Sequence, residues 1–139
     1  MEDKIFLSWN DIEVLVDNLA EQINKMDKKP FYIYGIPRGG AIPAVWLSHK
    51  TGIDYYQLNS TQISKTANLS HILIVDDICD SGETIKKLKE NFPKCQTATL
   101  YHKITAIDKP DIYGEISTYD WLYFPWENQQ SSEVRDNTY

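Results

Sequence analysis

Residues 72–84 read ILIVDDICDSGET and join a strand signal to a loop of acids and hydroxyls. The four aliphatic residues Ile72–Val75 predict a strand buried on both faces, as in a parallel sheet. Asp76 and Asp77 follow directly, and two ionised carboxylates in close proximity repel each other unless a cation lies nearby. A Mg²⁺ ion bridged to the oxygens of a substrate would supply that cation. We therefore expect a functional loop at this strand end.

A helix that is predicted to reach about Asn91 opens with Asp80, Ser81, Gly82, Glu83 and Thr84. Backbone N–H groups at a helix start, a glycine that allows close approach and flanking hydroxyls form a cradle for a phosphate group. The alternative is that Asp80 is only an N-cap, a common feature of helix starts. A cap alone does not need two further acids at the strand end, so the whole arrangement favours an anion site.

Strands and helices alternate along the rest of the chain. Apolar residues at helical spacing predict a helix after Ser8, which can form a capping box with Asp11. We expect a second helix over 41–50 and further strands over 31–34, 55–58, 97–101 and 121–124. This order indicates one α/β domain over residues 1–127, with a mainly parallel sheet flanked by helices, and a polar tail over 128–139. Ligands of such sheets bind at the carboxyl ends of the strands, where loops 35–40 and 76–84 lie.

Composition and charge exclude several function classes. The 139 residues carry a net charge of −6, which makes the chain a poor candidate for binding a nucleic-acid backbone. No apolar run approaches the roughly 20 residues of a membrane span, and residues 1–9 do not resemble a secretory signal. We therefore expect a cytoplasmic protein with no membrane partner. Cys79 and Cys95 are too few for a zinc site and are expected to be free thiols.

Three segments resemble a known family. Ile72–Thr84 resembles the phosphoribosyl pyrophosphate (PRPP) signature of type I phosphoribosyltransferases: an aliphatic strand, two acids, two spacers and D-[ST]-G-x-T. Tyr34–Leu47 (YGIPRGGAIPAVWL) is similar to the pyrophosphate-binding loop of bacterial xanthine-guanine phosphoribosyltransferases. Tyr119–Glu127 (YDWLYFPWE) resembles the T-W-I-x-x-P-W-[DE] segment of that group. The resemblance runs in the same order from about Ser8 to Glu127.

This resemblance implies the type I phosphoribosyltransferase fold and transfer of 5-phosphoribosyl from PRPP to a 6-oxopurine (guanine, xanthine or hypoxanthine). The products are a nucleoside 5′-monophosphate and pyrophosphate, Mg²⁺ is the cofactor, and the assembly is a dimer or tetramer. It assigns PRPP and its phosphates to Arg38, Gly39, Asp76, Asp77, Asp80, Ser81, Gly82, Glu83 and Thr84. It assigns the metal to Asp77 and Asp76, the general base to Asp80, and the purine to Lys103, Trp121 and Leu122.

The chemistry of these side chains agrees with the implied roles. Arg38 offers a forked, permanent cation for pyrophosphate oxygens, and Gly39 lets backbone N–H groups approach the same anion. The family also has a non-proline cis peptide in this loop, which here would precede Arg38. The flat face of Trp121 suits a flat base, although a core aromatic on an edge strand is the alternative. The ammonium of Lys103 has donors only and so favours a 6-oxo group over adenine.

Two segments depart from the family's pattern. The loop that closes over the reacting centre corresponds to Asn59–Ser70, which is short and offers only Lys65 as its basic residue. The segment Ala106–Tyr119 differs as well. A reduced lid leaves the site wetter, so a nucleotide glycosidic-bond hydrolase, a transferase for a non-purine base and a PRPP- or nucleotide-binding regulator remain alternatives. Cys79 is interpreted as structural, while His102 either lines the site or is structural.

Overall fold

The computed structural model describes residues 4–56 and 71–127, so the predicted lid (Asn59–Ser70, with Lys65) and the tail 128–139 lie outside the described residues. Five strands form the main sheet, and all of their pairings are parallel, in the order β3-β2-β4-β5-β6. The five are β2 (Tyr32–Gly35), β3 (Asp54–Tyr55), β4 (Ile72–Cys79), β5 (Gln96–Lys103) and β6 (Ile112–Ser117). The predicted α/β class with a parallel sheet is confirmed.

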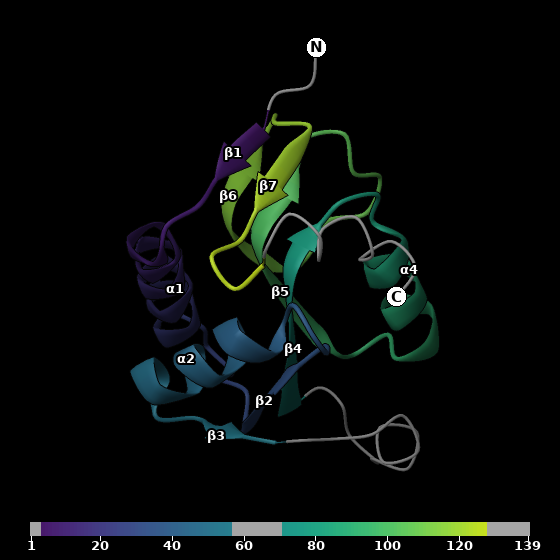
Figure 1. Cartoon of the computed structure of the whole chain (residues 1–139). Coiled ribbons are helices and arrows are strands. Elements are labelled where there is room, and N and C mark those ends of the chain that lie inside the picture. The colour runs from purple at the N-terminus through teal and green to yellow at the C-terminus, as the bar shows by residue number, and fades with distance from the viewer. Residues whose placement is uncertain (1–3, 57–70, 128–139) are drawn as a thin grey trace.

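Helices cover both faces of this sheet. Helices α1 (Trp9–Asn24) and α2 (Ala41–Thr51) lie on one face, and α4 (Glu83–Asn91) lies on the other (Figure 1). The predicted capping box starts α1: the Asp11 N–H donates to Ser8 Oγ at 3.1 Å, and the Ser8 N–H donates to Asp11 Oδ2 at 2.8 Å. None of the helices in the described ranges is long and apolar enough to span a membrane.

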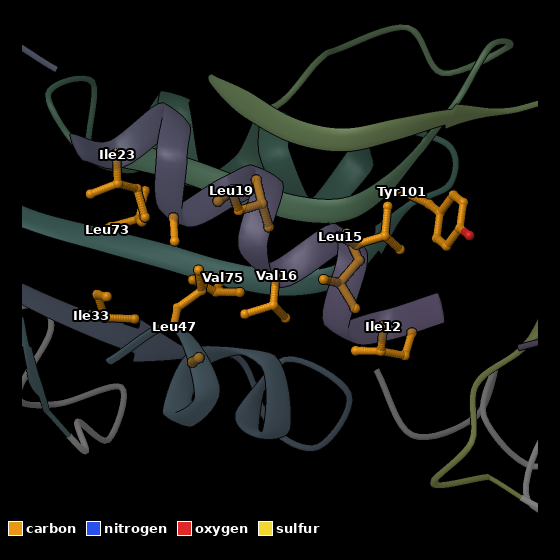
Figure 2. Close-up of a cluster of buried hydrophobic side chains, with 14 of the residues drawn as sticks. Ile12, Leu15, Val16, Leu19, Ile23, Ile33, Leu47, Leu73, Val75 and Tyr101 are labelled. Atoms are coloured by element: carbon orange, nitrogen blue, oxygen red, sulfur yellow. The ribbon is translucent and has the colours of Figure 1, made fainter. Parts of the chain in front are cut away.

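The aliphatic run of β4 serves both faces, because successive strand residues point to opposite sides. Leu73 and Val75 are fully buried in the larger core, together with apolar residues of α1 and α2 (Figure 2). Ile72 and Ile74 belong to a second cluster, against which Leu88 of α4 packs. Four consecutive aliphatic residues are therefore what a strand between two helical layers requires.

Two of the strands, β1 (Lys4–Phe6) and β6, were not predicted from the sequence. Strand β1 pairs in parallel with β7 (Trp121–Tyr123) in a separate two-stranded sheet. Strand β6 is at the edge of the main sheet and is mostly partly buried, and side chains of α1 donate to its backbone carbonyls: Asn18 to Gly114 at 3.1 Å and Gln22 to Tyr113 at 2.9 Å. Of β1, β6 and β7, only β7 was predicted, because its residues form an apolar and aromatic run, whereas KIF and IYGEIS mix apolar residues with charged residues or glycine.

Strands β4 and β5 are longer than the sequence indicates. The ladder continues past Val75, with Asp76 opposite Thr99 and Ile78 opposite Tyr101, so the two acids lie within β4 rather than after it. Lys103 likewise is the last residue of β5. Strand β3 ends at Tyr55, and residues 57 and 58 of the predicted strand 55–58 are outside the described residues. Polar residues continue a strand here because the neighbouring strands supply backbone hydrogen-bond partners.

The doubly buried strand gives a stability prediction. Leu73→Ala should lower the free energy of unfolding by about 2–5 kcal/mol, because the removed atoms leave a cavity under α1 and α2. Ile107→Ala is the control, since Ile107 is 89% exposed and its loss should change stability by less than about 0.5 kcal/mol. Urea unfolding of both variants measures the difference, and equal losses would contradict the assignment of Leu73 to the core.

Candidate active site

A pocket of about 250 Å³ lies at the carboxyl ends of β4 and β5. The end of β4, the start of α4, the end of β5 and strand β7 form its walls. The predicted site residues that line it are Asp76, Asp77, Asp80, Ser81, Gly82, Glu83, Thr84, Lys103, Trp121 and Leu122. Four separate elements thus bring most of the predicted PRPP residues and all of the predicted purine residues to one place, at the edge of the sheet where parallel α/β proteins bind ligands.

The two acids of β4 leave the strand on opposite faces. Asp76 is on the side of Ile74 and is half-buried, and its Oδ1 accepts the N–H of Asp77 at 2.9 Å. Asp77 is on the side of Val75 and is only 1% exposed, and its Oδ1 accepts the N–H of Ile78 at 2.7 Å. Each carboxylate therefore has its own backbone donor, and alternation along the strand separates two groups that are adjacent in sequence.

The loop between β2 and α2 packs directly against β4. Its Pro37–Arg38 peptide is cis, as the family resemblance implies. A Cβ at Gly39 would collide with the carboxylate of Asp77, and one at Gly40 would collide with the carbonyl oxygen of Val75. Both glycines are thus needed for the close approach of the loop to β4. Arg38 is exposed, and neither Arg38 nor Gly39 lines the 250 Å³ pocket, so the structure does not bring these two predicted residues into it.

The loop over residues 80–84 has its glycine at the helix start. Gly82 is the N-cap of α4, has a φ of 92° and makes no side-chain cap, so the alternative interpretation of Asp80 as the cap is wrong. A Cβ at Gly82 would also lie 2.6 Å from the backbone nitrogen of Asp108. The Glu83 N–H donates to Ser81 Oγ at 3.2 Å. The residues of this helix start line the pocket, and such a start has backbone N–H donors for an anion.

An ion pair joins the predicted general base to the predicted purine lysine. Lys103 Nζ lies 3.2 Å from Asp80 Oδ1 and donates to the carbonyl of Asp120 at 3.1 Å. The Lys103 side chain is 20% exposed and that of Asp80 is 64% exposed, so the ammonium is the more enclosed partner. Lys103 therefore connects the loop before α4 to the segment that leads into β7.

Strand β7 provides one wall of the pocket. Trp121 is half-buried there, and its Nε1 is buried with no hydrogen-bond partner in the described ranges. Leu122 is 4% exposed, and its side chain belongs to the main core. The backbone of Leu122 is thus the part available for reading a base edge, while the indole of Trp121 offers the flat surface.

Two residues at the pocket were not singled out from the sequence. Thr99 is fully buried on β5 opposite Asp76, and its hydroxyl has no hydrogen-bond partner in the part of the chain that the structure describes. Asp120 contributes its backbone carbonyl, which accepts a hydrogen bond from the ammonium group of Lys103. Thr99 is part of no motif, because the register of β4 and β5 places it beside Asp76. Asp120 lies within the segment Tyr119–Glu127, but its contact with Lys103 is long-range and is not visible in the sequence.

Cys79 has a structural environment, in agreement with its interpretation from the sequence. Its thiol is 3% exposed and donates to the carbonyl of Asp108 at 3.1 Å. Burial, followed by the charges of Asp76, Asp80 and Asp108, raises the pKa of the Cys79 thiol to about 11, which keeps it protonated.

His102 faces away from the pocket. It is 2% exposed and lies beside the ring of Tyr113, with the ring centroids 5.2 Å apart. Burial lowers the pKa of His102, and the charge of Lys109 lowers it further. Of the two interpretations from the sequence, the structural one is therefore supported.

Comparison with known proteins identifies the family. The phosphoribosyl transferase domain model matches residues 4–135. Xanthine-guanine phosphoribosyltransferases of Vibrio atlanticus and Idiomarina loihiensis are 27% and 26% identical to the chain, over 94% and 89% of it and 94% and 87% of their own lengths. A purine phosphoribosyltransferase structure from Pyrococcus horikoshii is 30% identical with a TM-score of 0.73, covering 91% of this chain and 95% of that one. This chain belongs to the phosphoribosyl transferase domain family.

Proposed function

We propose that this protein transfers the 5-phosphoribosyl group of PRPP to a 6-oxopurine and releases pyrophosphate. The observation that carries the proposal is the Asp80–Lys103 pair, 3.2 Å apart, in the same pocket as Trp121 and the start of α4. A carboxylate and a donor-only cation beside an aromatic face match the ring N–H, the oxo group and the flat ring of such a base. The similarity to the purine and xanthine-guanine phosphoribosyltransferases named above supports a purine as the base that accepts the phosphoribosyl group. Purine salvage in the cytoplasm by a dimer or tetramer is the role that we propose with this activity.

In the proposed reaction a purine nitrogen bonds to C1 of PRPP while the bond from C1 to pyrophosphate breaks. Orientation and charge placement supply most of the rate enhancement for such a transfer. Lys103 would leave Asp80 and donate to the 6-oxo oxygen, so that an oxygen of Asp80 becomes available to accept the proton of the purine nitrogen. Trp121 would hold the ring by stacking, and the backbone of Leu122 would bind the edge of the base.

The sugar phosphate would lie across the loops before α4 and α2. The N–H groups and hydroxyls of residues 81–84 would bind the 5′-phosphate, since they line the pocket at a helix start. Asp76 and Asp77 would bind the ribose hydroxyls. Arg38 and Gly39 would contact the pyrophosphate from the adjoining loop, which touches β4 through Asp77.

The donors at the end of β4 fit a magnesium ion. Asp76 and Asp77 offer carboxylate oxygens, and Mg²⁺ in proteins commonly takes one or two carboxylates together with oxygens of a phosphorylated substrate. Asp76 is the more accessible of the two, because Asp77 is 1% exposed. Bound there, the ion would neutralise pyrophosphate and improve it as a leaving group.

A product assay tests the reaction. The protein is incubated with PRPP and Mg²⁺ and, in separate tubes, with guanine, xanthine, hypoxanthine, adenine, uracil or no base, and the products are separated by chromatography. We expect a 6-oxopurine nucleotide that disappears when EDTA is added. Ribose 5-phosphate in the tube without base would instead indicate a hydrolase. No product in any tube would contradict catalysis and favour a binding protein.

Asp80→Asn tests the general base. The amide keeps the size of the side chain and cannot accept the proton, so kcat should fall by about 100-fold or more. The Kd for PRPP should change only a few-fold, because the backbone donors of α4 remain. Glu90→Gln, an exposed position of α4 that does not line the pocket, is the matched control. A rate near that of the wild type would exclude proton transfer by Asp80.

Lys103→Ala tests the purine contact. Loss of a charged hydrogen bond to the 6-oxo oxygen should lower kcat/KM for guanine by about 10- to 100-fold. The exposed Lys87→Ala on α4 serves as the control for removal of a positive charge. The same measurement in an Asp80→Asn background shows how far the two residues act together, since they form an ion pair. Unchanged guanine kinetics would mean that the base binds elsewhere.

A further inference from the structure

A second pocket lies at the opposite end of the main sheet from the candidate active site. Its volume is about 690 Å³, which is the size range of small-molecule sites. The connection from α1 to β2 and the starts of β4 and β5 form its walls. Because the strands are parallel, their starts lie at the edge of the sheet away from the carboxyl ends of β4 and β5 (Figure 1). This pocket, referred to below as the distal pocket, is not used by the proposed reaction.

The distal pocket concentrates positive charge in an acidic protein. Lys28, Lys29 and Lys94 line it, and Asp27 is the only carboxylate among its lining residues in the described ranges. None of the three lysines forms an ion pair with another residue in the described ranges. The whole chain carries a net charge of −6, so a pocket lined by three ammonium groups is opposite in charge to the protein as a whole. Their chemistry suits an anion with several charges, such as a chain of phosphates.

An aromatic platform adjoins these lysines. The ring of Phe31 stacks on the imidazole of His71, with the ring centroids 4.4 Å apart and an angle of 6° between the ring planes. The backbone fixes this arrangement, because the Phe31 N–H donates to the carbonyl of His71 at 2.8 Å. The Phe31 side chain is nevertheless 62% exposed. It therefore offers a surface on which a flat heteroaromatic ring can stack.

One polar group in the wall lacks a partner. Gln96 lines the distal pocket at the start of β5, and its Oε1 is buried with no hydrogen-bond partner in the described ranges. Buried polar atoms are normally hydrogen-bonded, so an unpartnered acceptor calls for a donor. The amino or ring N–H groups of a nucleobase are donors of this kind. Positive charge, an exposed aromatic ring and an unpartnered hydrogen-bond acceptor thus occur together in the distal pocket.

We propose that the distal pocket binds a nucleotide, with its base on Phe31 and its phosphates among Lys28, Lys29 and Lys94. The base edge lies toward the amide of Gln96. This site is separate from the one that would bind PRPP and a purine, so it adds an effector site to the protein. The proposal does not depend on the proposed function, because none of its residues lines the 250 Å³ pocket.

Calorimetric titration with ATP tests this site. ATP is the probe because adenine lacks the 6-oxo group that Lys103 would bind. We expect ATP to bind equally well with and without saturating PRPP, and equally well to Lys103→Ala. The double variant Lys28→Ala with Lys94→Ala should weaken binding at least tenfold. The control is Lys86→Ala with Lys87→Ala, which removes two exposed lysines of α4 outside both pockets and should leave the affinity unchanged.

Two further titrations separate the base from the phosphates. Phe31→Ala should lower the affinity for ATP several-fold and leave the affinity for inorganic triphosphate unchanged, because only the base of ATP would stack on the Phe31 ring. Triphosphate that binds the wild type as tightly as ATP would overturn the proposal of a nucleotide. The proposal would also be overturned if ATP did not bind or if PRPP competed with it. An equal loss of ATP affinity in the control variant of α4 would overturn it as well. Circular dichroism establishes that each variant is folded. Apart from Lys103, which is partly buried, all of the changed side chains are exposed.

Discussion

The rest of the structure depends on the burial of β4 on both of its faces. Leu73 and Val75 need α1 and α2 on one side, and Ile72 and Ile74 need α4 on the other. A strand enclosed in this way must also be central in the sheet, and β4 pairs with β2 and β5. The layered architecture follows from that single requirement. The same pairings place the loop after β2 and the end of β5 beside the acids of β4.

The buried carboxylate of Asp77 makes the end of β4 and the loop before α2 one unit. Burial of such a group is costly unless hydrogen bonds replace those to water, and the N–H of Ile78 provides one. Gly39 is required next to it because any side chain would collide with the carboxylate. Gly39, which the sequence suggests as a phosphate contact, thus has a packing role within the fold. A ligand that moved this loop would therefore also displace the carboxylate of Asp77, because Gly39 packs directly against it.

Local patterns in the sequence predicted local structure well. The run Ile72–Val75 indicated its own burial, and Ser8 with Asp11 formed the expected capping box, because both signals depend on neighbours within a few residues. Strands β1 and β6 were missed, since Lys4 in β1 and Gly114 and Glu115 in β6 interrupt their apolar residues. The acids and Lys103 were found as separate motifs, whereas the ion pair of Asp80 and the carbonyl contact of Asp120 required the register of the sheet.

The wall that carries Trp121 is held by contacts from distant parts of the chain. Strand β7 pairs with β1, so that Trp121 lies opposite Lys4, and Leu122 anchors the strand in the main core. Lys103 adds a polar connection, because its bond to the Asp120 carbonyl joins the start of β7 to the end of β5. A purine that took the ammonium of Lys103 would compete with both Asp80 and this carbonyl. Under the proposed function, purine binding would thus be coupled through the Lys103 side chain to the position of the strand that carries Trp121, which neither motif alone reveals.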